Sequence, residues 1–576
     1  MLTILLTSTL FMALQEPSLV SGSYRGPVDE AQFEMLASGN GTIGIFGHVL
    51  STTDSAWDRF EFWYENERHS IVRGGAGNSE TTLNEFGAYG SSRLSINRDE
   101  FLVKTIPLLI EATLSADAAA RESALLSLGR VAYPATTPFI IEALSDSEES
   151  VRQAAYVALG LMSTYESNRV LLDTFNHSQN YNAKCFAAVG LGLSERIDSA
   201  DCLNNFFRTM PDNNAWHAND NLIISALLAA KMNKSIDYSE NLLLMADVVN
   251  RREASNELQV ALIEALAAAP NVNTLQRLVE NINSKDKIVA EASISALGRI
   301  EADVATVNLI RLFEKTNSPR LQGLIQMSLG QIGSTKAVDF LVNNRPRLAD
   351  AFYVRTSWLI ACGLAKSSAT YDQVAGTLLH GSDYNKHDDA DASRKDEYEL
   401  RGAAALSLGL YARPAARIQL EKCLQEDSIS NELSGYIATA LGMLGTDEAT
   451  EVLLHNAEHF NQSPESRRGF ATALGMCANE RANAYLTEML ITNNDATVRW
   501  TLAHAMAGAR DQQSFDKLVS AIRADIHAVV TNERTAHLLL GLGYLGDAHS
   551  GATLESFVAN VDFRRQNKML NCLKSY

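Results

Sequence analysis

Apolar residues recur along most of the chain at the spacing of helices that bury one face. The segment Tyr133–Met162 shows the unit. Pro134 suits the first turn of a helix, and Ser145-Asp146-Ser147 supplies residues that favour caps and turns. A second helix is predicted over Val151–Leu161, because its apolar residues follow i, i+3, i+4, i+7, i+8 spacing. The segment is therefore a predicted helical hairpin.

The same anatomy repeats in register. A motif of small and apolar residues that ends in Leu-Gly recurs along the chain. Its final glycine stands at Gly129, Gly160, Gly192, Gly298, Gly330, Gly409, Gly442 and Gly475. Related versions end at Ala229, Ala267, Gly363, Gly508 and Gly541. One hairpin cannot bury its apolar face alone, whereas a stack of hairpins can. We expect an all-α protein, an α-solenoid that forms a right-handed superhelix of about thirteen helical hairpins.

Two features of the repeat invite a structural interpretation. The glycine lets the second helix of each hairpin lie close to its neighbours, and its place near the helix end suits the turn into the next unit. A cation precedes the glycine by eight residues in six units, at Arg121, Arg152, Lys184, Arg355, Arg401 and Arg467. We expect these cations to pair with the acidic inter-helix turn of an adjacent repeat. A basic binding ladder is the alternative.

The N-terminus has the features of an export signal. Met1–Leu14 is apolar but too short to span a bilayer, Pro17 ends it, and Val20-Ser21-Gly22 offers small residues for cleavage. We expect residues 1–22 to be a signal peptide and the mature chain to be soluble and exported, to the periplasm or cell envelope. An ordinary N-terminal helix on a cytoplasmic protein is the alternative.

Residues 23–98 are predicted to be an irregular segment that contains one aromatic helix, 56–72, before a solenoid over 99–576. On that helix Trp57, Phe60 and Tyr64 share one face, with Trp63 beside them. We expect the helix to cap the open apolar end of the first repeat, as a unit near Gly551–Tyr576 would cap the last. The alternative is that Trp57 and Trp63 bind a partner.

Two insertions interrupt the repeat spacing. Met210–Asn221 carries Trp216 and His217, which are candidates for partner binding; a polar connector is the alternative. Gly381–Glu399 is expected to be a solvated excursion. Its acidic cluster is a weak metal-site candidate that lacks the calcium-loop pattern. The cluster consists of His387, Asp388, Asp389 and Asp391.

Composition narrows the function. The 576 residues include 49 Lys and Arg against 68 Asp and Glu, a net charge of −19 that disfavours a nucleic-acid partner. The six cysteines show no metal-ligand spacing and are expected to be mostly buried thiols, with a Cys185–Cys202 disulfide as an alternative. No phosphate loop, nucleophile elbow or His-Glu metal motif is present. We therefore assign no catalytic residues and no cofactor.

The repeats resemble HEAT repeats, in particular the short phycobilin-lyase-like subclass, whose Asp-x-x-x-Val-Arg-x-x-Ala-x-x-Ala-Leu-Gly pattern stands at Asp146–Gly160. The N-terminal segment is similar to one found in exported HEAT-repeat proteins of planctomycete bacteria, through Phe62-Trp63-Tyr64-Glu65-Asn66 and Tyr24-Arg25-Gly26-Pro27. The resemblance implies a repeat scaffold and no particular activity.

We therefore expect a monomeric, non-enzymatic scaffold that binds a protein or peptide in the concave groove of the solenoid. A repeat-scaffold enzyme, or a lyase-like chaperone that holds a small ligand or metal, is the alternative. A mechanical spacer of the cell envelope is a third possibility.

Overall fold

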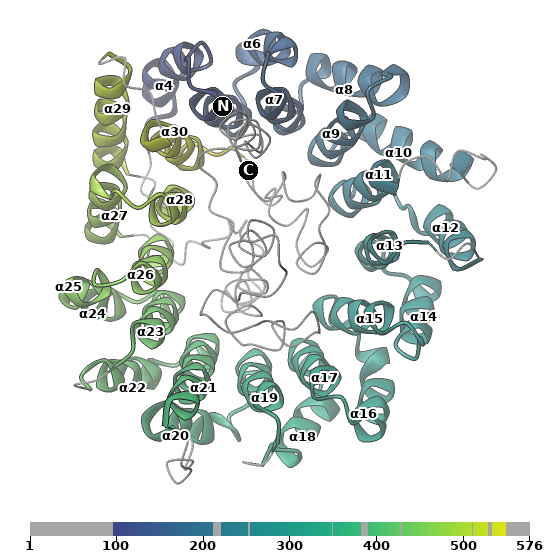
Figure 1. Cartoon of the computed structure of the whole chain (residues 1–576), viewed down its shortest axis with the longest axis vertical. Coiled ribbons are helices and arrows are strands. Elements are labelled where there is room, and N and C mark those ends of the chain that lie inside the picture. Colours follow the sequence, from purple (N-terminus) through teal and green to yellow (C-terminus); the bar gives the residue numbers. More distant parts are fainter. Residues whose placement is uncertain are drawn as a thin grey trace, which may run out of the picture.

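The computed structural model describes residues 96–210, 220–251, 254–347, 350–381, 390–426, 429–477, 479–509, 511–527 and 533–548. Within these ranges the chain is helical and contains no strand. The helices form two concentric rings, and the chain alternates between them, except that the short α25 follows α24 in the outer ring (Figure 1). The predicted all-α solenoid of thirteen hairpins is confirmed.

The inner ring consists of α5 (Ala118–Val131), α7 (Glu149–Met162), α9 (Tyr181–Leu193), α11 (Asp220–Met232), α13 (Asn256–Ala268), α15 (Lys287–Arg299), α17 (Pro319–Ile332), α19 (Phe352–Ala365), α21 (Ala390–Tyr411), α23 (Asn431–Leu444), α26 (Pro464–Cys477), α28 (Ala496–Ala505) and α30 (Glu533–Leu545).

The outer ring consists of α4 (Arg98–Ala112), α6 (Thr137–Glu142), α8 (Tyr165–His177), α10 (Ile197–Thr209), α12 (Ser239–Arg251), α14 (Val272–Asn281), α16 (Thr306–Lys315), α18 (Thr335–Asn343), α20 (Tyr371–His380), α22 (Pro414–Leu424), α24 (Asp447–His455), α25 (Ala457–Phe460), α27 (Glu480–Thr492) and α29 (Gln512–His527). Four short 3-10 turns adjoin these helices in the described part of the chain: η2 (Pro134–Thr136), η3 (Ala143–Ser145), η6 (Asp303–Ala305) and η7 (Met506–Gly508).

The recurrent glycine is where neighbouring inner helices approach most closely. A Cβ added to Gly160 would lie 2.6 Å from Gly190 Cα, and one added to Gly330 would lie 2.6 Å from Ala361 Cα. The predicted packing role of the glycine is thus confirmed. Its predicted role in the turn is wrong. The left-handed residue that ends the helix stands three positions later, for example at Ala132, Ser163 or Glu195, each with φ near +50°.

The stack closes on itself, because the last inner helix, α30, packs against the first, α5 (Figure 1). The junction uses the register of the internal junctions. A Cβ added to Gly543 would lie 2.7 Å from Ser127 Cα, and Ser127 Oγ donates a 2.8 Å hydrogen bond to Leu539 O. Ser127 stands two residues before the glycine of its own repeat, Gly129, and Leu539 stands four before Gly543.

Two internal junctions contain the same hydrogen bond at the same offsets. Ser328 Oγ donates to Ile294 O at 2.8 Å, and Ser407 Oγ donates to Leu359 O at 2.7 Å. The closing contact is therefore an ordinary inter-repeat interface, formed between the two ends of the chain.

The outer helices complete the seam. Lys104 Nζ of α4 lies 2.7 Å from Asp516 Oδ1 of α29, and the rings of Phe101 and Phe515 are 5.0 Å apart. Arg98 donates hydrogen bonds to Gly546 O at 3.0 Å and to Val131 O at 2.6 Å.

The structure changes three sequence expectations. The superhelix closes into a ring, in which the first and last repeats cover each other; the predicted capping helix 56–72 and the predicted terminal unit Gly551–Tyr576 lie outside the described residues. The packing glycine of the last repeat is Gly543 rather than Gly541. Part of the insertion Gly381–Glu399 is helical, since α21 already begins at Ala390.

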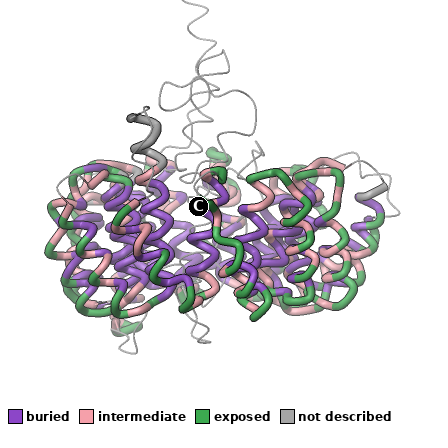
Figure 2. Tube along the Cα trace, turned by 90° about the horizontal axis from the view of Figure 1, so that it is seen from below, coloured by how far each residue is buried: buried purple, intermediate pink, exposed green. Residues whose placement is uncertain are grey.

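Seen from the side, buried residues follow the interior of the ring and exposed residues gather on its outside and on its two rims (Figure 2). One rim carries the turns within hairpins, and the other carries the turns between hairpins. We call the second one the inter-hairpin rim. In the part of the chain that the structure describes, no helix is both long and apolar enough to cross a membrane.

Candidate interaction surface

The partner-binding and metal candidates named from the sequence cannot be placed. Trp57, Trp63, Trp216, His217, His387, Asp388 and Asp389 lie outside the described residues. Asp391 falls in the first turn of α21, but its side chain is outside the described part. Among the described residues, no group of three or more His, Cys, Asp or Glu side chains is arranged to hold a metal ion. These candidates stay predictions.

The cation that precedes the glycine has a structural role in the hairpins where its contacts are resolved. Arg121 binds Asp146 of the next inter-helix turn through two 2.9 Å hydrogen bonds, as expected from the sequence. It also donates to Ser115 O, six residues before it, at 2.9 Å. Arg152 and Arg467 likewise donate to the carbonyl six residues before them. These side chains therefore satisfy turn carbonyls that helix ends leave without partners.

Glutamine replaces the cation in another hairpin without losing the contact. Gln322 Nε2 donates to Thr316 O at 3.1 Å, again six residues before it. An uncharged donor at this position fits a backbone-capping role better than a basic binding ladder.

The inner helices also contain a buried ion-pair cluster. Glu264 of α13 lies between Lys231 of α11, at 3.1 Å, and Arg299 of α15. Burial alone would raise the pKa of Glu264, but the two cations lower it below its usual value. The cluster joins three consecutive repeats.

An aromatic and cationic stack crosses the closing seam. The rings of Trp500 and His504, both on α28, are 3.8 Å apart, and His504 lies 4.5 Å from Tyr544 of α30. The Arg130 guanidinium of α5 stands 3.7 Å from the Tyr544 ring centroid and pairs with Asp547 at 2.8 Å. Burial raises the pKa of Tyr544 to about 12. The stack ties the first repeat to the last two.

All five described cysteines are free thiols, so the alternative of a Cys185–Cys202 disulfide is wrong for this structure. Burial raises the pKa of the Cys185 thiol to about 11, which keeps it protonated and unreactive near neutral pH.

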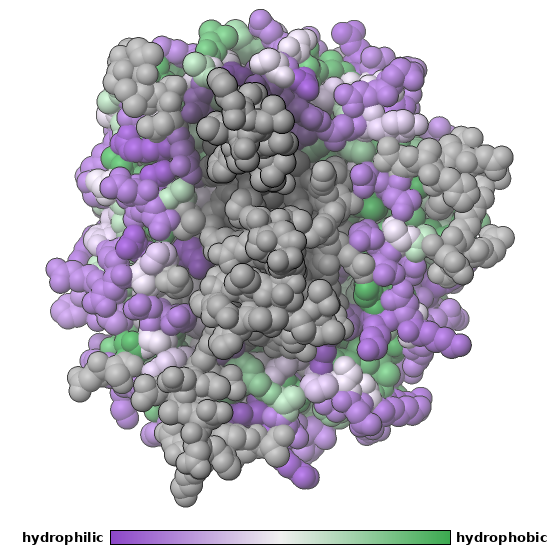
Figure 3. Space-filling view, viewed as in Figure 1, coloured by the Kyte–Doolittle hydropathy of each residue, from purple (hydrophilic) through white to green (hydrophobic). Residues whose placement is uncertain are grey.

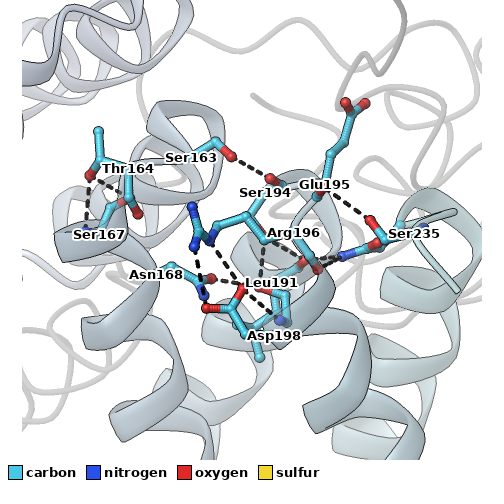
Figure 4. Close-up of polar contacts among 12 residues, drawn as sticks. Ser163, Thr164, Ser167, Asn168, Leu191, Ser194, Glu195, Arg196, Asp198 and Ser235 are labelled. Atoms are coloured by element: carbon cyan, nitrogen blue, oxygen red, sulfur yellow. Dashed lines mark hydrogen bonds and ion pairs between the residues drawn. The ribbon is translucent and has the colours of Figure 1, made fainter.

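Hydrogen bonds join successive turns along the inter-hairpin rim between α7 and α12 (Figure 4). Ser163 Oγ donates to Ser194 O in the next turn. Ser235 Oγ, one turn further, donates to Glu195 O at 2.9 Å. Asn233 Nδ2 adds bonds to Leu191 O and Arg196 O at 3.2 and 3.1 Å.

The Arg196 guanidinium braces its own turn, 3.0 Å from Asp198, and Ser199 Oγ of α10 donates to Asn168 Oδ1 of α8 at 2.5 Å, which joins neighbouring repeats. Burial tends to raise the pKa of Asp198, but the hydrogen bond with Arg196 holds it below its usual value. The backbone of three consecutive turns is therefore fixed by side chains rather than left as independent loops.

Large apolar side chains stand exposed on this braced rim. Five of these side chains form a set that we call the apolar rim: Tyr133, Tyr165, Ile197, Val272 and Val304, which are between 40% and 79% exposed. Tyr165, Ile197 and Val272 are the first residues of the outer helices α8, α10 and α14. Tyr133 lies just before η2, and Val304 lies within η6. The position between Ile197 and Val272 carries the half-buried Ile236.

The opposite half of the rim differs. The first residue of the outer helix is polar in α18 (Thr335), α24 (Asp447) and α27 (Glu480), whereas α20 begins with the buried Tyr371 and α22 with Pro414. An acidic residue there complements the helix dipole, whereas an exposed apolar side chain gains nothing from folding. The apolar rim is therefore a candidate contact surface.

Figure 3 views the ring along its axis and shows that hydrophilic residues predominate on this face, with hydrophobic residues in separate small patches.

The sequence already contained the signal for the apolar rim. Tyr165, Ile197 and Val272 each follow their repeat's glycine or alanine anchor by five residues. The signal has meaning only once it is known that this position faces solvent.

A family model described as HEAT repeats matches residues 106–192 and 457–538. Among solved structures, the chain is similar to one in the complex of CpcE and CpcF of phycocyanin lyase from Nostoc, with 17% identity over 46% of this chain and 94% of that chain and a TM-score of 0.28. Human deoxyhypusine hydroxylase in complex with glycerol is 15% identical over 55% of this chain and 96% of that chain, with a TM-score of 0.20.

A mutant of Kap121p is 12% identical over 81% of this chain and 56% of that chain, with a TM-score of 0.30. No curated protein matches the chain. The two segments that the family model matches stand near opposite ends of the described residues, and the hairpins between them share one anatomy. The chain thus contains HEAT repeats in these two segments.

Proposed function

We propose that the chain is a non-enzymatic scaffold that binds a protein or peptide through the apolar rim of its closed ring. The observation that carries the proposal is the set of exposed apolar side chains at five of six consecutive inter-hairpin turns, which the described residues at the corresponding positions of the opposite half lack. The five side chains stand on separate turns, and it is their repetition near the start of successive outer helices that supports an interaction site. This surface differs from the concave groove expected from the sequence, and binding in that groove stays a prediction.

The turns that carry these side chains support the proposal. The hydrogen bonds from Ser163, Asn233 and Ser235 hold neighbouring turns in fixed positions. A surface ordered before binding loses little conformational entropy when a partner arrives, which favours affinity.

We further propose that the binding takes place in an exported compartment. The apolar run Met1–Leu14, the small residues Val20-Ser21-Gly22 and the likeness of the N-terminal segment to exported planctomycete proteins support this. The N-terminal sequence of the mature protein tests it. A chain that begins at Ser23 agrees with export, and one that retains Met1 contradicts it.

Affinity capture with the full chain tests the binding role. Three baits are compared in an extract of the native cell envelope: the wild type, the double variant Tyr165→Ser/Ile197→Ser, and Ile418→Ser as the matched control. Ile418 is an exposed apolar residue of α22, away from the apolar rim.

We expect at least one protein to be recovered with the wild type and with Ile418→Ser, and at least tenfold less of it with the double variant. Because both replaced side chains are exposed, the melting temperature should stay unchanged. Equal recovery by all three baits would overturn the proposal. Recovery of no protein together with a bound metal or chromophore would favour the alternative, a lyase-like or enzymatic scaffold.

A further inference from the structure

The first outer helix, α4, carries a stripe of apolar residues on its solvent-facing side. Val103 is 74% exposed, and Leu114, in the turn that follows the helix, is 80% exposed. Between them Pro107 is exposed and Ile110 is half-buried. These four residues, which we call the α4 stripe, are separated by four, three and four positions, so they share one helix face. In the rest of the described chain, no outer helix with its following turn carries two large exposed apolar side chains.

The closing seam brings a later part of the chain to the start of this helix. Arg98, the first residue of α4, donates a 3.0 Å hydrogen bond to Gly546 O. Ala548, two positions further on, is the last residue that the structure describes. Val103 lies about 8 Å along the helix axis from Arg98. Because the five residues 549–553 span up to about 17 Å, the segment that follows them is within reach of the α4 stripe.

The sequence of that segment repeats the spacing of the α4 stripe. Leu554, Val558 and Val561 are separated by four and three positions, as are the first three residues of the stripe. A helix over 552–562 would present them on one face, with Phe557 beside them. Two parallel helices whose apolar residues alternate in steps of four and three pack side by side in register. The two patterns are therefore complementary in spacing and in length.

Charge favours the same contact. Five acidic side chains against three cations stand on α4, on α6 and on the face of α29 that meets α4. The acidic residues are Asp99, Glu100, Glu111, Glu142 and Asp516, and the cations are Arg98, Lys104 and Arg523. Lys517 of α29 points to α27, where it lies 3.9 Å from Glu488. Residues 552–574 carry the opposite balance, with four cations against two acidic residues: Arg564, Arg565, Lys568 and Lys574 against Glu555 and Asp562. Unlike charges would thus meet when the segment docks.

We propose that residues 552–562 form a helix that docks parallel to α4 on the α4 stripe. A tether of a few residues gives an effective concentration of about millimolar, so a contact of a few apolar side chains suffices. The docked helix covers the outside of the closing seam and adds a contact between the first and last repeats. The inference goes beyond the proposed function, since α4 carries no residue of the apolar rim.

Hydrogen–deuterium exchange of the full chain, followed by mass spectrometry, tests the docking. Val103→Asp places a charge in the α4 stripe at an exposed position, and Ile418→Asp does the same on α22 as the matched control. We expect amides of residues 552–562 to exchange at least tenfold more slowly in the wild type and in Ile418→Asp than in Val103→Asp. Amides of α4 should stay equally protected in all three, which shows that the ring is intact.

The other occupants of the α4 stripe give different results. Fast exchange of residues 552–562 in all three proteins would overturn the inference, and so would slow exchange that ignores Val103→Asp. If Val103→Asp releases the aromatic segment 56–72 instead, that segment is the occupant and the inference fails. It also fails if protection in the wild type grows with protein concentration, because a second copy then covers the stripe. None of these outcomes alters affinity capture through the apolar rim, so the proposed function is tested separately.

A disulfide provides an independent measurement of the register. In a Cys572→Ser chain, the pair Val103→Cys and Leu554→Cys should form an intramolecular disulfide under mild oxidation, because parallel in-register helices bring these positions together. The pair Ile418→Cys and Leu554→Cys should not. Equal yields for the two pairs, or no disulfide in the first, would contradict the docking.

Discussion

Burial and charge conflict most clearly at one residue, Glu122 of α5. Its side chain is buried in the inner ring, and this burial raises its pKa to about 7, against the opposing effects of a hydrogen bond with Ser150 and of the Arg121 charge. The unfolded chain would ionise near the ordinary value of 4.5. Between these two values the native state holds the proton that the unfolded state has lost.

The stability of the ring should therefore fall as pH rises from about 4.5 to 7 and then level off, as far as Glu122 contributes. We predict that Glu122→Gln removes this pH-dependent loss of unfolding free energy. In the wild type the loss reaches about 3 kcal/mol once the pH is above neutral. Melting temperatures of variant and wild type at pH 5 and pH 8 measure it. The variant should gain on the wild type at pH 8 relative to pH 5, and an equal difference at both values would refute the assignment.

Other features at the residue scale show what could be predicted from the sequence and what could not. The contact of Arg121 with the next acidic turn was predictable, because a cation recurs eight residues before the repeat's glycine and the next inter-helix turn contains Asp146. The left-handed helix ends at Ala132, Ser163 and Glu195 were not, because none of these residue types favours positive φ. Their conformation is imposed by the packing of the hairpins that they join.

At the scale of elements, hairpins and their register follow directly from the sequence. Apolar periodicity placed the second helix of the Tyr133–Met162 unit at Val151–Leu161, and the structure has α7 at Glu149–Met162. The recurrent Leu-Gly phrase marked the packing position because only a residue without a side chain allows such an approach. The apolar rim is harder to predict from the sequence. Three of its five residues are recognised only when the structure shows that each one begins an outer helix.

Alanine at two glycines should separate close packing from helix propensity. Gly160→Ala places a methyl group 2.6 Å from Gly190 Cα and should destabilise the ring by about 1–3 kcal/mol. Gly376→Ala, in α20, meets nothing within 4 Å and should stabilise it by up to about 1 kcal/mol. Thermal melts of both variants measure the contrast. Equal shifts of the same sign would show that the glycine has no packing role.

At the scale of the whole molecule, closure is the feature that the repeat pattern left open. Whether thirteen hairpins form a ring or an open superhelix depends on a small rotation at every junction, and local periodicity does not encode that angle. A signal existed all the same. A terminal repeat of an open solenoid needs a polar outer face. Here Phe101 in the first hairpin, and Phe515 and Leu539 in the last, are all buried.

The closed ring is the central claim, and a zero-length crosslink across the seam tests it most directly. A carbodiimide joins a lysine amine to a carboxylate only in direct contact, and Lys104 Nζ lies 2.7 Å from Asp516 Oδ1 although 412 residues separate them. Lys517 and Glu488, 3.9 Å apart on neighbouring outer helices, serve as the internal control. We predict that mass spectrometry finds both the Lys104–Asp516 and the Lys517–Glu488 links, with a yield that does not change with protein concentration. A Lys517–Glu488 link without a Lys104–Asp516 link would contradict the ring.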